Sequence, residues 1–93
     1  AYEAIGDYRS AILDWSTVIK HDPNNAAAFN NRGLNYFDLH EYEAAINSFT
    51  KAISLDPNAR AIYNNRADAY EAMNEFDKAE QDRQHAVSPT PAA

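Results

Sequence analysis

Two pairs of adjacent asparagines, Asn30-Asn31 and Asn64-Asn65, stand 34 residues apart in the chain. A side-chain amide carries both a hydrogen-bond donor and an acceptor, and the main chain of an extended peptide offers the same two groups. Amides repeated on one surface can therefore hold a peptide through its backbone, irrespective of its side chains. The two pairs predict a surface that binds an extended segment.

The other reactive side chains form no catalytic or metal-binding pattern. The sequence has no cysteine, which excludes disulfides and thiolate zinc sites. Its three histidines, His21, His40 and His85, fall on different predicted elements with no i, i+4 pair. It has only two glycines and contains neither a phosphate loop nor a nucleophile elbow. We therefore expect no enzyme activity, no catalytic residue, no cofactor and no metal site.

The spacing of the amides is a period of the whole chain. Pro23, Pro57 and Pro91 follow one another at the same interval of 34 residues. A repeat of this length is typical of stacked units that bury their apolar faces only against their neighbours. The same interval joins Tyr36 with Tyr70, Glu41 with Glu75, Ala45 with Ala79 and Ala52 with Ala86, and a partial first copy joins Tyr2 with Tyr36, Tyr8 with Tyr42, Ala11 with Ala45 and Ile12 with Ile46.

Each unit has the pattern of two amphipathic helices. Phe29, Gly33 and Tyr36 recur at i, i+4 and i+7, and apolar residues between Tyr42 and Ile53 repeat this spacing. The spacing predicts helices at about 8 to 21, 25 to 39, 42 to 55, 59 to 73 and 76 to 87, preceded by a stub at about 1 to 5.

Punctuating residues fall between these helices. Asn24 and Asn58 each follow a proline and are expected to cap the next helix. Gly6, His40 and Asn74 separate the paired helices, where we expect a left-handed residue.

Two arginines, Arg32 and Arg66, lie near the buried side of their helices. Their stems can cover apolar surface while the guanidinium reaches a carboxylate such as Asp14 or Asp82. We expect structural pairing for both.

The unit Phe29, Arg32-Gly33, Tyr36, Ala45, Phe49, Ala52 and Pro57 resembles the tetratricopeptide repeat in residue types and spacing. Some positions depart from that pattern: arginine replaces leucine at Arg32 and Arg66, Ala67 replaces glycine, and Arg83 replaces an aromatic residue. The resemblance implies an all-α fold, a right-handed α-solenoid of antiparallel helix pairs with about two and a half repeats. It also implies a concave groove lined by the first helix of each pair.

The repeat divides the chain into four predicted segments. They are a partial first repeat at 1–25 with the end of one helix and a second helix, a complete repeat at 26–59, a terminal capping repeat at 60–87 and a flexible tail at 88–93. Glu80 and Arg83 make the last helix polar where Ile46 and Phe49 stand one repeat earlier, as expected of a capping repeat. The alignment of Ala1 with the middle of a helix predicts a fragment of a longer repeat array.

Helical spacing places Asn31, Leu34 and Asp38 on the side of their helix opposite Phe29, with Asn30 beside them. The next unit repeats this surface with Asn65, Asp68 and, at its edge, Asn64. The family resemblance implies that this surface is the ligand groove and that asparagines at the registers of Asn31 and Asn65 hold peptide main chain. The predicted site residues are Asn30, Asn31, Leu34, Asp38, Asn64, Asn65 and Asp68.

Charge narrows the expected partner. With 14 acidic and 8 basic residues the net charge is −6, and no basic cluster is present, so we expect neither nucleic acid nor a membrane surface as a partner. A variant of the family grips terminal carboxylates with basic residues, but Ala61 and Asn65 occupy their positions here. Asp38, Asp68 and Glu71 add negative charge, so we expect a protein or peptide partner with a neutral or basic segment.

Two alternatives to a peptide-binding module remain open at this stage. The chain could be a substrate-docking or scaffolding segment of a larger enzyme, for example a glycosyltransferase, or a purely structural element. In the second case a homo-oligomer is expected to form through residues 1 to 20, whose helix lacks part of its partner. No apolar run of membrane-spanning length is present, and a cytoplasmic location is favoured.

Overall fold

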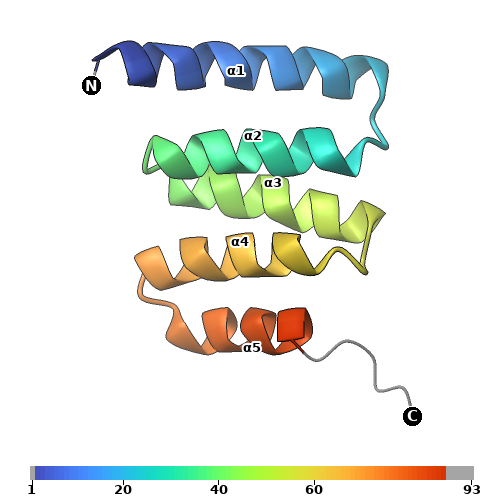
Figure 1. The fold of residues 1–93 in the computed structure, drawn as a ribbon, viewed down its shortest axis with the longest axis vertical. Coiled ribbons are helices and arrows are strands. Elements are labelled where there is room, and N and C mark those ends of the chain that lie inside the picture. The colour runs from blue at the N-terminus through green and yellow to red at the C-terminus, as the bar shows by residue number, and fades with distance from the viewer. Residues whose placement is uncertain (1, 88–93) are drawn as a thin grey trace.

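Five helices make up the part of the chain that the structure describes, which is the backbone of residues 2–87 and the side chains of residues 6–86. The computed structural model has α1 at Tyr2–His21, α2 at Ala26–Asp38, α3 at Tyr42–Leu55, α4 at Arg60–Ala72 and α5 at Phe76–Val87 (Figure 1). These residues contain no strand, and the predicted all-α fold is confirmed. None of the described helices is both long and apolar enough to cross a membrane. The predicted flexible tail lies outside the described residues.

The helices stack along the long axis of the molecule, and each runs antiparallel to the one before it (Figure 1). α2 packs on α3 and α4 packs on α5, while α1 packs on α2 and α3 packs on α4. α2 also contacts α4, the next helix but one. The result is an elongated slab of 46 × 31 × 15 Å, in which each helix contacts only its near neighbours, as in a solenoid.

The predicted break at Gly6 is wrong, because α1 is one continuous helix from Tyr2 to His21. Over the described residues 2–25, the predicted stub and the helix predicted at 8 to 21 are a single element and form no helix pair. A short stub closes few hydrogen bonds of its own, whereas a continued helix keeps each backbone N–H bonded along the segment. Gly6 lacks a Cβ and fits either geometry, so the uninterrupted helix forms.

The other two turns follow the prediction. His40 and Asn74 both adopt a left-handed conformation with φ of 63°. Behind them, the N–H of Glu41 donates to the carbonyl of Tyr36 and the N–H of Glu75 to that of Tyr70, both at 2.9 Å. This bond closes the Schellman motif, which satisfies carbonyls at the end of a helix and requires one left-handed residue.

The predicted helix caps are one residue out of place. The side chain of Asn25, not Asn24, accepts the N–H of Ala28 at 3.0 Å, and α4 begins after Ala59, which forms no side-chain cap. The reason is a β-turn at each proline, closed by a bond from the N–H of Asn25 to the carbonyl of Asp22 at 3.1 Å, and by its counterpart at Ala59. Proline favours the second position of such a turn, so the following asparagine occupies the third and the helix starts later.

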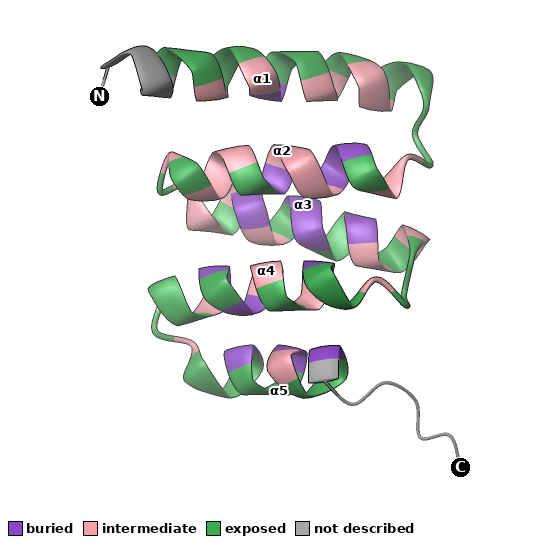
Figure 2. Cartoon of the chain, viewed as in Figure 1, coloured by how far each residue is buried: buried purple, intermediate pink, exposed green. Residues whose placement is uncertain are grey.

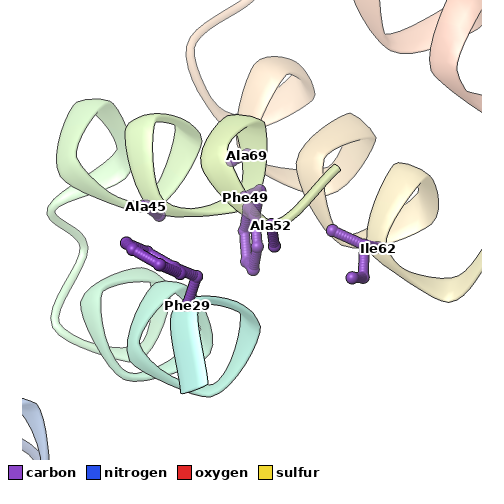
Figure 3. Packing of buried hydrophobic residues seen from close by; sticks show 6 residues of the cluster. All are labelled: Phe29, Ala45, Phe49, Ala52, Ile62 and Ala69. Carbon is purple, nitrogen blue, oxygen red and sulfur yellow. The ribbon is translucent and has the colours of Figure 1, made fainter. Parts of the chain in front are cut away.

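The core lies between α2, α3 and α4, where Figure 2 shows most of the buried surface at the middle of the stack. Phe49 is fully buried at its centre. Small side chains around it let the helices approach closely, and this buried cluster consists of Phe29, Ala45, Phe49, Ala52, Ile62 and Ala69 (Figure 3).

Gly33 is required by the same packing. A Cβ at Gly33 would lie only 2.6 Å from Cε1 of Phe49, so the ring rests on the bare backbone of α2. One repeat later Ala67 stands at the position of Gly33 and is fully buried, while Arg83 stands at the position of Phe49. The alanine is accommodated there because the facing residue carries no ring at that point.

Arg66 pairs with Asp82 as predicted. Its Nε donates to Oδ2 at 2.8 Å and its Nη2 to Oδ1 at 2.7 Å, while its Nη1 donates to the hydroxyl of Thr50 at 3.1 Å. The hydrogen bonds to Asp82 raise the pKa of the Arg66 guanidinium, against a smaller lowering by burial. This arginine therefore joins α4 to both α3 and α5.

The predicted carboxylate partner of Arg32 is wrong. Arg32 donates instead to the hydroxyls of Ser48 at 3.2 Å and Ser16 at 3.3 Å, and Asp14 is exposed. Ser48 and Ser16 occupy the registers of Asp82 and Thr50, one repeat earlier in the chain. Each arginine thus joins its own helix to the helix before it and the helix after it. The acceptors are two hydroxyls for Arg32, and a hydroxyl and a carboxylate for Arg66.

Candidate functional site

The predicted site residues lie on two helices that contact each other, α2 and α4. We call this set the amide face, and it consists of Asn30, Asn31, Leu34 and Asp38 on α2 and Asn64, Asn65 and Asp68 on α4. Ile62 and Ala69 bury the opposite side of α4 in the core and thereby fix the rotation of this helix. That these residues bind a ligand stays a prediction.

One hydrogen bond joins the two halves of the amide face. The Nδ2 of Asn65 donates to the Oδ1 of Asn30 at 2.9 Å, and both residues are half-buried. The repeat pattern placed Asn30 and Asn65 at different registers and gave no sign of this contact. It arises because the first asparagine of one pair faces the second asparagine of the next pair across the α2–α4 contact.

The remaining amides are not engaged in this way. Asn31 is half-buried and Asn64 is exposed, and neither forms a side-chain hydrogen bond with any residue that the structure describes. Leu34 is 37% exposed and adds apolar surface beside Asn31. Their polar groups are thus free to meet a ligand.

The acidic residues of the face have unequal surroundings. Asp38 is exposed at the end of α2 and forms no ion pair within the described part of the chain. Asp68 and Glu71 each accept a hydrogen bond from Nη2 of Arg83 at 3.1 Å. Sequence reasoning assigned Arg83 only to the polar cap of the stack and missed this contact, although its register, which is that of Phe49, directs it toward the first helix of its repeat.

Two other surfaces bear on the predictions. A shallow depression lies at the turn before α5, lined by Asn74 to Lys78, and no residue of the amide face lines it. On α1, Ile12 is buried, whereas Tyr8, Ala11 and Trp15 are half-buried and Leu13 is 69% exposed. α1 therefore buries Ile12 and leaves Leu13 as its exposed apolar side chain among these residues, and self-association through residues 1 to 20 stays a prediction.

Family comparisons agree with this repeat architecture. Two tetratricopeptide repeat models match the chain, one over residues 26–59 and the other over residues 48–81. The first match coincides with α2 and α3 and the turns that bound them. No curated protein matches the chain in sequence.

Solved structures extend the similarity to almost the whole chain. The second tetratricopeptide domain of Spaghetti (RPAP3), bound to the HSP90 peptide SRMEEVD, is 28% identical with a TM-score of 0.87, over 91% of this chain and 79% of that one. The TPR2B domain of yeast Sti1, in a complex with pHsp70, is 27% identical with a TM-score of 0.80, over 94% and 74%. MamA is 27% identical with a TM-score of 0.86, over 88% of this chain but only 48% of its own. The chain belongs to the tetratricopeptide repeat family.

Proposed function

We propose that the chain is a protein-interaction module that binds an extended peptide segment across α2 and α4 through an asparagine ladder, which consists of Asn31 and Asn65. The observation that carries this proposal is the position of these two amides, half-buried at the same repeat register on two helices in contact. Similar domains of Spaghetti and Sti1 were solved with an HSP90 peptide and with pHsp70, which supports this class of ligand.

The preferred segment is neutral or basic. Asp38 and Asp68 lie on the amide face with Glu71 close to it, and Arg83 is the only base that pairs with an acid of this face within the described residues. Ala61 and Asn65 provide no positive charge for a terminal carboxylate. An acidic segment would therefore meet a surface of like charge, which lowers its affinity.

The test compares short blocked peptides of basic, neutral and acidic composition, including SRMEEVD, by isothermal titration calorimetry. Basic or neutral peptides should bind more tightly than acidic ones. Replacing both ladder residues, in N31A/N65A, should weaken binding by about 5- to 150-fold, because two hydrogen bonds to the peptide main chain are lost, at about 1–3 kcal/mol in total.

The matched control is N24A/N58A, which removes two exposed turn amides at the same 34-residue spacing. This control should leave both helix content and peptide affinity unchanged. Equal affinities for the ladder variant and the control would show that the ligand, if any, binds elsewhere.

The two alternatives predict different behaviour in the same experiment. A docking segment of a larger enzyme would bind the peptides as an interaction module does, and only the activity of the complete protein distinguishes the two. A purely structural element would bind none of them.

A further inference from the structure

The two ladder amides differ in how firmly they are held. Asn65 donates one of its two N–H groups to Asn30 across the helix contact, whereas Asn31 forms no hydrogen bond with the described residues. A side-chain amide without a partner can turn over and exchange its oxygen and nitrogen, but a bonded one keeps a fixed orientation. Asn65 thus presents a free oxygen acceptor and one free N–H in a set order.

We propose that Asn30 is a positioning residue that orients the Asn65 amide for peptide main chain, an inference that rests on the proposed function. The acceptor oxygen of Asn30 holds the Nδ2 of Asn65, so the Oδ1 and the second N–H of Asn65 face a ligand without prior reorientation. A group ordered before binding loses less freedom when the ligand arrives, and this raises affinity without any new contact.

The repeat supplies an internal comparison. Asn64 is the counterpart of Asn30 one repeat later, but it is exposed and bonds no described residue. If the first asparagine of each pair acted directly on the ligand, both would matter. If the first asparagine instead acts by orienting the second asparagine of the following repeat, only Asn30 can do so, because it bonds Asn65.

A structural role for the bond is the competing explanation. The contact between α2 and α4 is, however, already supported by the apolar cluster that includes Phe29, Ile62 and Ala69. Loss of a hydrogen bond between two half-buried amides should therefore change peptide affinity more clearly than it changes the stability of the fold.

The experiment measures the affinity of the chain for a fluorescein-labelled pool of blocked basic peptides by anisotropy, with the stability of each variant followed in urea. N30A should weaken binding by about 3- to 10-fold, since the Asn65 amide loses its fixed orientation. N58A, which removes an exposed turn amide outside the amide face, is the control and should bind within about twofold of the parent. In the N65A background, N30A should cause no further loss, because nothing remains to be oriented.

Rescue by a conservative variant separates orientation from packing. N30D keeps an oxygen that accepts the Asn65 N–H and should restore affinity, while N58D, outside the amide face, measures the effect of an added charge. In NMR spectra, one side-chain N–H of Asn65 should shift in N30A and not in N58A. Such a shift shows that N30A removes the bond to Asn65, and the affinities of N30D and of the N30A/N65A double variant then separate a positioning role from a structural one.

The outcomes distinguish the positioning role of Asn30 from the proposed function. If N65A weakens binding but N30A does not, the positioning role is wrong and the proposed ladder stands. If no peptide binds, or if N65A binds like the parent, the proposed function fails, and the role of Asn30 fails with it.

Discussion

At the scale of single residues, the packing between α2 and α3 shows why one position of the repeat accepts glycine in one copy and alanine in the next. Gly33 faces Phe49, whose ring leaves no room for a Cβ. Ala67 faces the register now held by Arg83, whose guanidinium turns to Asp68 and Glu71 instead. The two departures from the family pattern at Ala67 and Arg83 are therefore one change, made at two positions that face each other.

Gly33→Ala should destabilise the fold despite the better helix propensity of alanine. The propensity gain is about 1 kcal/mol, whereas forcing a methyl group into a filled core costs about 1–3 kcal/mol. Phe49 is fully buried and its ring has little space to retreat. Urea unfolding followed by circular dichroism should give a lower midpoint for the variant.

The matched control is Ala67→Gly, which should lose only about 0.5–1 kcal/mol through helix propensity. Gly33→Ala combined with Phe49→Leu should cost less than the sum of the single changes, since the two positions are in contact. A Gly33→Ala variant as stable as the parent would mean that the ring yields easily.

Of the two half-buried arginines, the sequence predicted the partner of Arg66 correctly and that of Arg32 wrongly. The repeat shows that Arg32 and Arg66 are equivalent positions. A carboxylate partner was predicted for both arginines, and only Arg66 has one, Asp82. A period of 34 residues says which positions are equivalent, but not which helices of the stack lie within hydrogen-bond distance. The bond between Asn30 and Asn65 escaped the sequence for the same reason.

At the scale of elements, the helix boundaries of α3 and α5 agree with the amphipathic pattern, and those of α2 and α4 differ from it by about one residue at each end. Apolar periodicity was sufficient there because each of these helices buries one side against a neighbouring helix of the stack. It failed at α1, where backbone hydrogen bonding alone decides between a turn and a continuous helix.

The turns between paired helices each contain one left-handed residue, His40 or Asn74. His40→Asn should stabilise the fold by about 0.5–1 kcal/mol, because asparagine adopts a positive φ at lower cost than most residues with a side chain. The variant loses the hydrogen bond between the Tyr42 hydroxyl and Nδ1 of His40, but that bond is exposed and contributes little. Thermal unfolding measures the change.

The reciprocal substitution, Asn74→His, is the control, because Asn74 has the same φ of 63° in the same motif. It should destabilise the fold by a similar amount. Two shifts of the same sign would show that the surroundings of the turn, and not its backbone conformation, determine the preference.

At the scale of the whole molecule, the two ends of the stack treat their outer helices differently. On α5, Glu80 is exposed, and Arg83 pairs with Asp68 and Glu71, so polar groups cover the face that Ile46 and Phe49 occupy one repeat earlier. On α1, Leu13 is 69% exposed at a register that holds Asn47 and Gln81 in the following repeats. An apolar residue thus replaces a polar one on the outer surface of α1.

We propose that the chain self-associates through residues 1 to 20, and that this association depends on Leu13 together with half-buried Trp15. Burial of apolar surface contributes about 25 cal/mol per Å², and a second copy of α1 offers a matching surface. Light scattering over a wide range of concentrations should show an increasing mass for the parent chain. Leu13→Asn should remain a monomer, whereas Leu34→Asn, which removes the exposed leucine of the amide face, should associate like the parent. A parent chain that stays a monomer at all concentrations would refute this proposal. It would mean that α2 covers enough of α1 to leave too little apolar surface for a second copy.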